Sequence, residues 1–168
     1  MLRKIFSLFT EKCSNKNALS SEAIDAAKNG NLSQLSECLD EGANAQFKES
    51  TALILACQSG NVDCARLLLK HGADPSAQDG SALTRAVLSN ELETVSMLLS
   101  TGMDVAETSA AYCATVDGHY EALELILSSG AKVPERYASY AEKNGHHGAA
   151  ALIRSCSDDR SPHHQEIG

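Results

Sequence analysis

The side chains of this sequence that could do chemistry are its cysteines and histidines. Six cysteines stand at positions 13, 38, 57, 64, 113 and 156, and none of them forms a Cys-x-x-Cys pair. A secreted disulfide scaffold would be shorter and richer in loops. The pattern therefore favours reduced thiols that serve as small apolar residues in the core of a cytoplasmic protein. Cys13 and Cys113 lie in less constrained positions, yet neither stands in a pattern that predicts a reactive thiol.

The histidines do not follow a metal-binding pattern. They stand at positions 71, 119, 146–147 and 163–164. Neighbouring residues at a helix start point about 100° apart and rarely share one ion, and no ligand spacing accompanies these pairs. The chain also lacks a nucleophile elbow, a phosphate-binding loop, an H-E-x-x-H motif and a dinucleotide fingerprint. We therefore expect no metal site, no cofactor and no enzymatic activity.

The elements that carry these side chains arise from an internal repeat. In the central copy, Leu53, Ala56 and Cys57 follow helical spacing, which predicts a first helix with one apolar stripe. Gly60 is placed to end that helix in a left-handed cap. A second apolar stripe predicts a helix that returns antiparallel to the first and ends at Gly72.

The repeat runs through most of the chain. An alanine recurs at positions 26, 56, 86, 114 and 141, at spacings of 30, 30, 28 and 27 residues. One helix pair cannot bury its apolar stripes alone, whereas stacked neighbours can. The spacing predicts about five stacked helix pairs over residues 21–156.

The central copy resembles the ankyrin repeat. Residues 51–56 read Thr-Ala-Leu-Ile-Leu-Ala beside the family's Thr-Pro-Leu-His-x-Ala, and residues 68–75 read Leu-Leu-Lys-His-Gly-Ala-Asp-Pro. Segments 60–61 and 118–119 stand where the family has Gly-His. The resemblance implies an all-α ankyrin-repeat solenoid of stacked antiparallel helix pairs. Because the family's period is about 33 residues, the shorter spacings here predict short loops or fingers between pairs.

Two segments flank the repeats. Residues 1–20 begin with apolar side chains at helical spacing and carry a basic excess, which predicts an N-terminal amphipathic helix or cap on the first repeat. The alternative is a basic amphipathic anchor to a membrane or a partner. The apolar start is too short for a signal peptide, and no stretch is long enough to span a bilayer. Residues 157–168 are expected to form a disordered tail.

The charge of the chain bears on its partners. The formal net charge is −8, and carboxylates are densest at Glu37, Asp40, Glu41 and Glu49. Such a surface disfavours nucleic acid, whose phosphates need a basic face. The carboxylates form either an ordinary solvated surface or a patch that steers a partner protein with a basic patch. We expect a monomer that binds another protein in the cytoplasm.

The resemblance also implies a binding surface, because ankyrin stacks expose their first helices and fingers along a concave face. Leu88 and Val116 are apolar where this face is expected, Tyr112 is of a type enriched in binding hot spots, and Arg85 offers a bidentate donor. The predicted protein-binding surface is completed by residues at equivalent or edging positions, namely Gln58, Asp79, Ser89, Glu107 and Asp117. The alternative is that Leu88 and Val116 pack only against each other or a finger.

These features favour one function over two others. The leading prediction is a protein–protein interaction module, an adaptor, inhibitor or neutralising partner that binds through its concave face. The alternative is a membrane-associated adaptor anchored by the N-terminal basic segment. An enzyme would need a buried polar constellation that the sequence does not predict.

Overall fold

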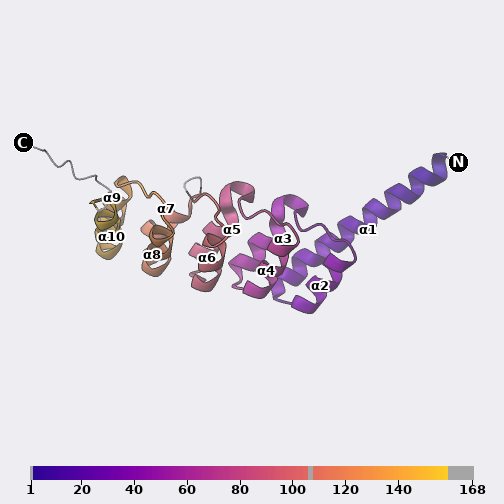
Figure 1. Cartoon of the computed structure of the whole chain (residues 1–168), viewed down its shortest axis with the longest axis horizontal. Helices are drawn as coiled ribbons and strands as arrows, with labels where there is room; N and C mark the ends of the chain where they lie inside the picture. Colours follow the sequence, from indigo (N-terminus) through magenta and orange to yellow (C-terminus); the bar gives the residue numbers. More distant parts are fainter. Residues whose placement is uncertain (1, 106–107, 159–168) are drawn as a thin grey trace, which may run out of the picture.

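The computed structural model describes residues 2–105 and 108–158, with side chains for residues 15–105 and 108–156. Within these ranges the chain forms ten α-helices and no strand, arranged as an elongated row (Figure 1). The helices are α1 (Leu2–Asn29), α2 (Leu32–Asp40), α3 (Phe47–Gln58), α4 (Val62–Lys70), α5 (Ala77–Leu88), α6 (Leu92–Leu99), α7 (Ala110–Asp117), α8 (Tyr120–Ser128), α9 (Arg136–Lys143) and α10 (His147–Asp158).

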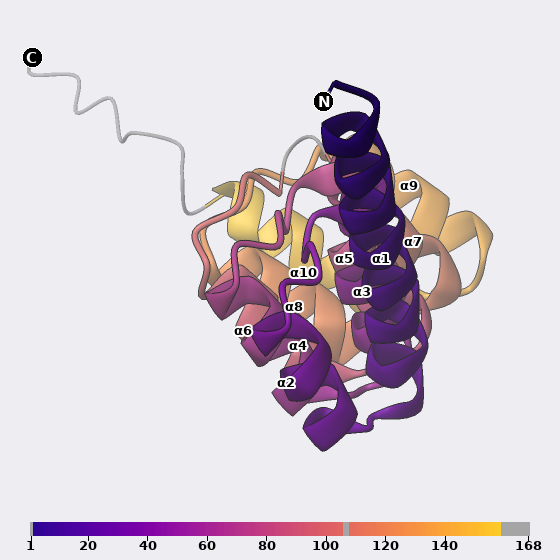
Figure 2. The ribbon, with the colours of Figure 1, turned by 90° about the vertical axis from the view of Figure 1, so that its right-hand side faces the viewer.

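The ten helices form five pairs stacked in two rows. Viewed along the stack, the first helices α1, α3, α5, α7 and α9 lie on one side and the second helices on the other (Figure 2). Each first helix packs against the next first helix, and each second helix against the next second helix. The predicted all-α solenoid of stacked helix pairs is therefore confirmed.

One apolar core runs through the whole stack. Leu53 and Leu83, one copy apart in the first-helix row, are both 0% exposed, and Leu98 of the second-helix row is buried with them. Burying one such side chain contributes about 1.5–3 kcal/mol. Alanines fill many of the remaining core positions, which lets neighbouring helices approach closely.

Neighbouring copies are also joined by side chains that cap helix ends. The amide of Asn61, which precedes α4, donates hydrogen bonds to the carbonyls of Ala27 and Lys28 at 3.0 and 2.9 Å. These carbonyls belong to the last turn of α1, whose final carbonyls have no partner within the helix. The contact therefore fixes the second pair against the first.

The connections between pairs are loops, as the short spacing predicted. Before α3 and α5 become regular, residues 48–50 and 78–80 form left-handed turns with φ between 49° and 69°. The hydroxyl of Ser50 accepts a hydrogen bond from the N–H of Asp74 at 2.9 Å, and that of Ser20 accepts one from Asn44 at 2.9 Å. Each loop is thus bound to the first helix of the pair that it follows: the loop after α2 to α1, and the loop after α4 to α3.

The N-terminal segment and the first repeat share one helix. The predicted boundary at residue 20 lies inside α1, which runs from Leu2 to Asn29 without a break and whose N-terminal part extends beyond the stack (Figure 1). Ser20 lies inside this helix, and its hydroxyl donates to the carbonyl of Lys16 at 2.7 Å, one turn earlier. For residues 1–12, the cap on the stack and the membrane anchor both stay predictions.

The chain ends were also assigned from the sequence. Of the expected tail at 157–168, residues 157 and 158 belong to α10, and residues 159–168 lie outside the described residues. No helix in the described ranges is both long enough and apolar enough to cross a membrane.

A buried hydroxyl gives a first test of the packing. Thr94, in α6, is 0% exposed, and its Oγ1 is the one buried side-chain polar atom without a hydrogen-bond partner in the described part of the chain. Valine has nearly the same shape and removes that unpaired group. We expect Thr94→Val to raise the free energy of unfolding by about 1 kcal/mol, measured by urea denaturation followed by circular dichroism.

Thr115 provides the matched control for this test. It is equally buried, in α7, but its hydroxyl donates to the carbonyl of Ala111 at 2.7 Å. Thr115→Val removes a hydrogen bond that is already made, so no gain is expected. An equal gain in both variants would mean that the missing partner at Thr94 is not the cause.

Candidate functional site

The first helices present a continuous outward surface, which we call the first-helix face. In α5, Ala82, Leu83, Ala86 and Val87 are buried, and the residues between and after them point away from the core. The face comprises the outward positions of four helices: Thr51, Leu55 and Gln58 of α3; Ser81, Thr84, Arg85 and Leu88 of α5; Tyr112, Cys113 and Val116 of α7; and Arg136, Ser139, Tyr140 and Lys143 of α9. This repeated spacing follows from the helical period, which returns to the same side every three or four residues.

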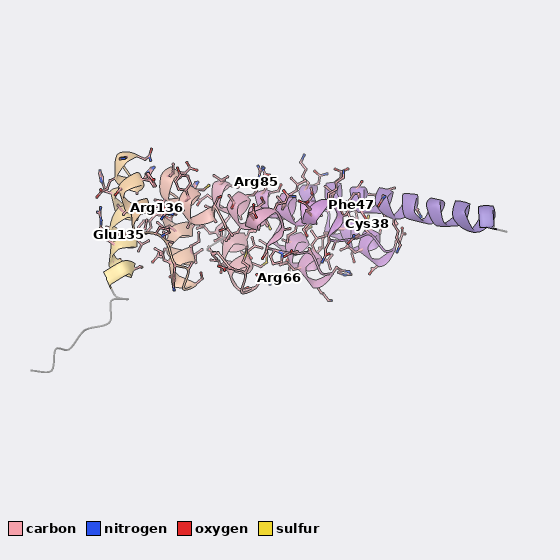
Figure 3. All side chains as sticks on the ribbon, turned by 90° about the horizontal axis from the view of Figure 1, so that it is seen from above. Cys38, Phe47, Arg66, Arg85, Glu135 and Arg136 are labelled. Atoms are coloured by element: carbon pink, nitrogen blue, oxygen red, sulfur yellow. The ribbon has the colours of Figure 1, made fainter. Side chains whose placement is uncertain are left out.

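Several predicted site residues lie on this face. Leu88 and Tyr112 are 44% and 42% exposed, Arg85 is exposed and Val116 is half-buried. Arg85 lies on the side of the first helices, whereas Arg66 of α4 lies on the opposite side (Figure 3). Leu88 and Arg85 belong to α5, and Tyr112 and Val116 belong to α7; these two helices pack directly against each other.

Of the remaining predicted residues, Gln58 also belongs to the face and is exposed as the last residue of α3. The others border the face or fall elsewhere. Asp117 is exposed as the last residue of α7, and Ser89 is exposed just after α5. Asp79 belongs to the left-handed turn before the regular part of α5 and is also exposed. Glu107 lies outside the described residues.

Three tyrosines form a cluster at the C-terminal end of the face, here called the tyrosine cluster. The ring centroid of Tyr112 lies 5.4 Å from that of Tyr137 and 6.0 Å from that of Tyr140, at interplanar angles of 68° and 81°. The rings of Tyr137 and Tyr140 are 6.2 Å apart. Edge-to-face contacts of this kind favour the pairing beyond the area that they bury, so the three rings form one ordered surface.

Only one member of this cluster, Tyr112, was among the predicted site residues; Tyr137 and Tyr140 were not. The available signal was the register of the last copy, in which Tyr140 of α9 corresponds to Cys113 of α7 on the outward stripe. The contact itself depends on how α7 packs against α9, which the sequence does not specify.

Cationic side chains flank the tyrosine cluster. The guanidinium carbon of Arg136 lies 5.4 Å from the ring centroid of Tyr137, and Nζ of Lys143 lies 6.0 Å from that of Tyr140. Such contacts between a cation and an aromatic face contribute about 0.5–1 kcal/mol at exposed sites. The arrangement offers an apolar surface with positive charge at its edge.

Three cysteines of the helix pairs, Cys57, Cys64 and Cys113, are not activated for nucleophilic chemistry. Burial raises the pKa of Cys57 to about 12. The pKa of Cys64 is raised by burial and then by Asp63, and that of Cys113 by burial and then by Asp117. Because the thiolate is the nucleophile, these shifts make the thiols less reactive at neutral pH. The described residues also contain no group of three or more metal-ligating side chains placed to hold an ion.

The helix pairs and their order agree with a known repeat family. A family model of ankyrin repeats matches residues 23–109 as three copies. The chain belongs to the ankyrin-repeat family. No curated protein matches the chain significantly. The ankyrin stack continues past the matched segment, because α7 to α10 add two further pairs with the same packing. Ankyrin repeats generally bind other proteins and are typically non-enzymatic interaction modules.

Proposed function

We propose that this ankyrin-repeat chain binds another protein through its first-helix face and acts as an adaptor, inhibitor or neutralising partner. The observation that supports the proposal is the run of exposed apolar side chains on three successive first helices. Leu88 of α5, Tyr112 of α7 and Tyr140 of α9 are 44%, 42% and 39% exposed. Large apolar side chains that gather on one face favour a binding surface, whereas isolated ones do not.

The second-helix row supplies the comparison. Its exposed large apolar residues, Leu32 of α2 and Tyr120 of α8, lie on helices separated by α4 and α6. They therefore cannot form one patch. On the first-helix face, the exposed residues lie on neighbouring helices that pack together. Half-buried Val116 adds apolar surface on α7, and half-buried Leu55 adds it on the preceding first helix, α3. Aromatic anchors of this type often dominate binding energy.

A double substitution tests the proposal. The partner is first isolated from the native host by affinity purification, identified by mass spectrometry and then purified, so that its affinity can be measured by isothermal titration calorimetry. Removing two partly exposed anchors, Leu88→Ala with Tyr112→Ala, is expected to weaken binding by at least about tenfold. The helical circular-dichroism signal should be unchanged, because neither side chain belongs to the core.

The matched control carries Leu32→Ala and Tyr120→Ala. These residues have the same types and nearly the same exposure, 41% and 42%, but lie on the second-helix row. The control should bind the partner as tightly as the unchanged protein. Loss of binding in the control, with full affinity retained by the Leu88 and Tyr112 variant, would place the interface on the other row and reject the proposal.

A further inference from the structure

The outward stripes beside the tyrosine cluster differ in charge from the protein as a whole. The chain has a formal net charge of −8, yet the ionic side chains on the outward stripes of α5, α7 and α9 are Arg85, Arg136 and Lys143. The carboxylates of these helices and of the residue before α9 lie off the stripes, namely Asp79, Asp117, Glu135 and Glu142, and Glu142 is already paired with Arg154. The outward stripes themselves are therefore cationic.

The three cations are not neutralised within the protein. In the part of the chain whose side chains are described, the one salt bridge joins Arg154 to Glu142 at 2.6 Å, and it links α10 to α9. Arg85, Arg136 and Lys143 make no ion pair there. Arg136 and Lys143 instead lie over the rings of Tyr137 and Tyr140, which leaves their charge available to an incoming anion.

The apolar and cationic features lie side by side. Tyr112 of α7 exposes apolar surface between Arg85 of α5 and the pair Arg136 and Lys143 of α9, because α5, α7 and α9 pack in that order. Leu88 adds apolar surface beside Arg85 on α5 itself. A guanidinium can bind a carboxylate with two parallel hydrogen bonds. An occupant that satisfies both features needs carboxylates flanking an aromatic or aliphatic side chain.

We infer that the occupant of this end of the face is an acidic segment of the partner protein, with an aromatic or aliphatic residue between its carboxylates. The inference rests on the proposed binding function of the first-helix face and specifies the chemistry of its partner. An acidic segment differs from the basic patch that the net charge of the chain suggested for the partner. The exposed carboxylates of α2 and the loop after it, Glu37, Asp40 and Glu41, could engage such a basic surface, but they belong to the opposite row.

A nucleic acid fits the same surface less well. A polyanion would be repelled by the net charge of −8 over the remaining surface, whereas a short acidic segment needs to contact only Arg85, Arg136 and Lys143 on the outward stripes. Screening limits these interactions to about 8 Å at physiological ionic strength. Leu88 and Val116 also offer apolar contact that a phosphate backbone cannot use.

Selection from a random peptide library displayed on phage tests the inference on the full chain. Peptides are selected on the unchanged protein and counter-selected on a variant with Arg85→Glu, Arg136→Glu and Lys143→Glu. The enriched peptides should carry Asp or Glu on both sides of an aromatic or aliphatic residue. A synthetic copy of the most enriched peptide should bind the charge-reversal variant at least about tenfold more weakly than the unchanged protein.

Two further variants separate charge from fold. A control with Lys16→Glu, Arg66→Glu and Lys70→Glu changes the net charge equally on α1 and α4, away from the tyrosine cluster, and should keep most of the affinity. Replacing the three cations by glutamine gives a milder form of the main variant and should also weaken binding. Circular dichroism confirms that each variant is folded.

The intrinsic fluorescence of the protein reports on the site directly. The chain has four tyrosines and no tryptophan, and three of the four tyrosines form the cluster. With Tyr120→Phe in α8, every remaining tyrosine belongs to the cluster. Peptide binding at the inferred site should therefore change the tyrosine emission of this variant.

The outcomes distinguish the inference from the proposed function. The selected peptides could be basic or neutral and bind the charge-reversal variant as tightly as the unchanged protein, yet fail to bind the variant with Leu88→Ala and Tyr112→Ala. That result would reject the acidic partner but support the first-helix face as the binding surface. Peptides unaffected by the Leu88 and Tyr112 substitutions would overturn the face itself. A selection that enriches no peptide would also reject the acidic segment. So would a short single-stranded oligonucleotide that displaces the peptide and binds the protein with the same affinity as the peptide.

Discussion

Truncating Leu83 to alanine should lower the free energy of unfolding by about 3–4 kcal/mol. Leu83 is 0% exposed and sits in α5, the middle of the five first helices, where it belongs to the one apolar core of the stack. The substitution loses the transfer free energy of the side chain and leaves a cavity that the neighbouring helices fill only in part. Urea denaturation, followed by circular dichroism, measures the loss.

Leu88→Ala is the matched control in the same helix. Leu88 lies five residues further along and is 44% exposed, so its truncation should change stability by no more than about 0.5 kcal/mol. Similar losses at Leu83 and Leu88 would contradict the assignment of Leu88 to the outward surface. A small effect of Leu88→Ala on stability would also show that any loss of partner binding in the Leu88 and Tyr112 variant comes from the interface and not from unfolding.

The repeat architecture gives the Leu83 result a second consequence. In a solenoid each pair contacts only its neighbours, so stability is a sum of local terms and interface terms. Removing Leu83 weakens the contacts of α5 with both α3 and α7. The same type of truncation at the end of the stack, Ile153→Ala in α10, breaks the core next to a single neighbouring pair and should be less damaging, although Ile153 is 1% exposed.

The helix pairs could be predicted from the sequence because the signal is local and repeated. Apolar residues three and four apart define one side of a helix, and a glycine ends it, so Leu53 and Leu83 could be assigned to the core without coordinates. Gly60 and Gly118 do adopt left-handed conformations, with φ of 67° and 73°. The short loops followed from comparing the spacing of the copies with the longer period of the family that they resemble.

Other features could not be predicted, because they depend on packing between copies. The contact of Tyr112 with Tyr137 requires the relative placement of α7 and α9, and no sequence period encodes it. Lys48 and Glu49 are left-handed, at φ of 49° and 54°, although neither residue type favours that conformation. The boundary predicted at residue 20 followed the start of the repeat resemblance at residue 21, and the start of a repeat does not require a break in the helix that carries it.

The charge of the binding surface shows a similar limit. A net charge of −8 describes the protein at a distance and supported the expectation of a basic partner. A partner that reaches the tyrosine cluster meets Arg136 and Lys143, held beside the rings of Tyr137 and Tyr140. Net charge influences encounter and solubility, but the residues that line a surface determine what can bind there.

The second large effect is expected at Gly118, where a pair of helices meets the next copy. Gly118 follows α7 with φ of 73°, and a Cβ added there would collide with the imidazole ring of His146, which precedes α10. Gly118→Ala therefore combines an unfavourable backbone conformation with a clash. We expect it to lower the free energy of unfolding by about 2–4 kcal/mol, measured by urea denaturation.

Gly130→Ala separates the two causes. Gly130 has a similar φ of 87°, but a Cβ added there meets nothing within 4 Å, so only the backbone cost of about 1 kcal/mol is expected. If the additional loss at Gly118 comes from the ring, removing the ring in a His146→Ala background should recover most of it, and the double-mutant cycle measures that coupling. Equal losses at Gly118 and Gly130, with no recovery, would mean that the close contact between these copies does not hold the last two pairs together.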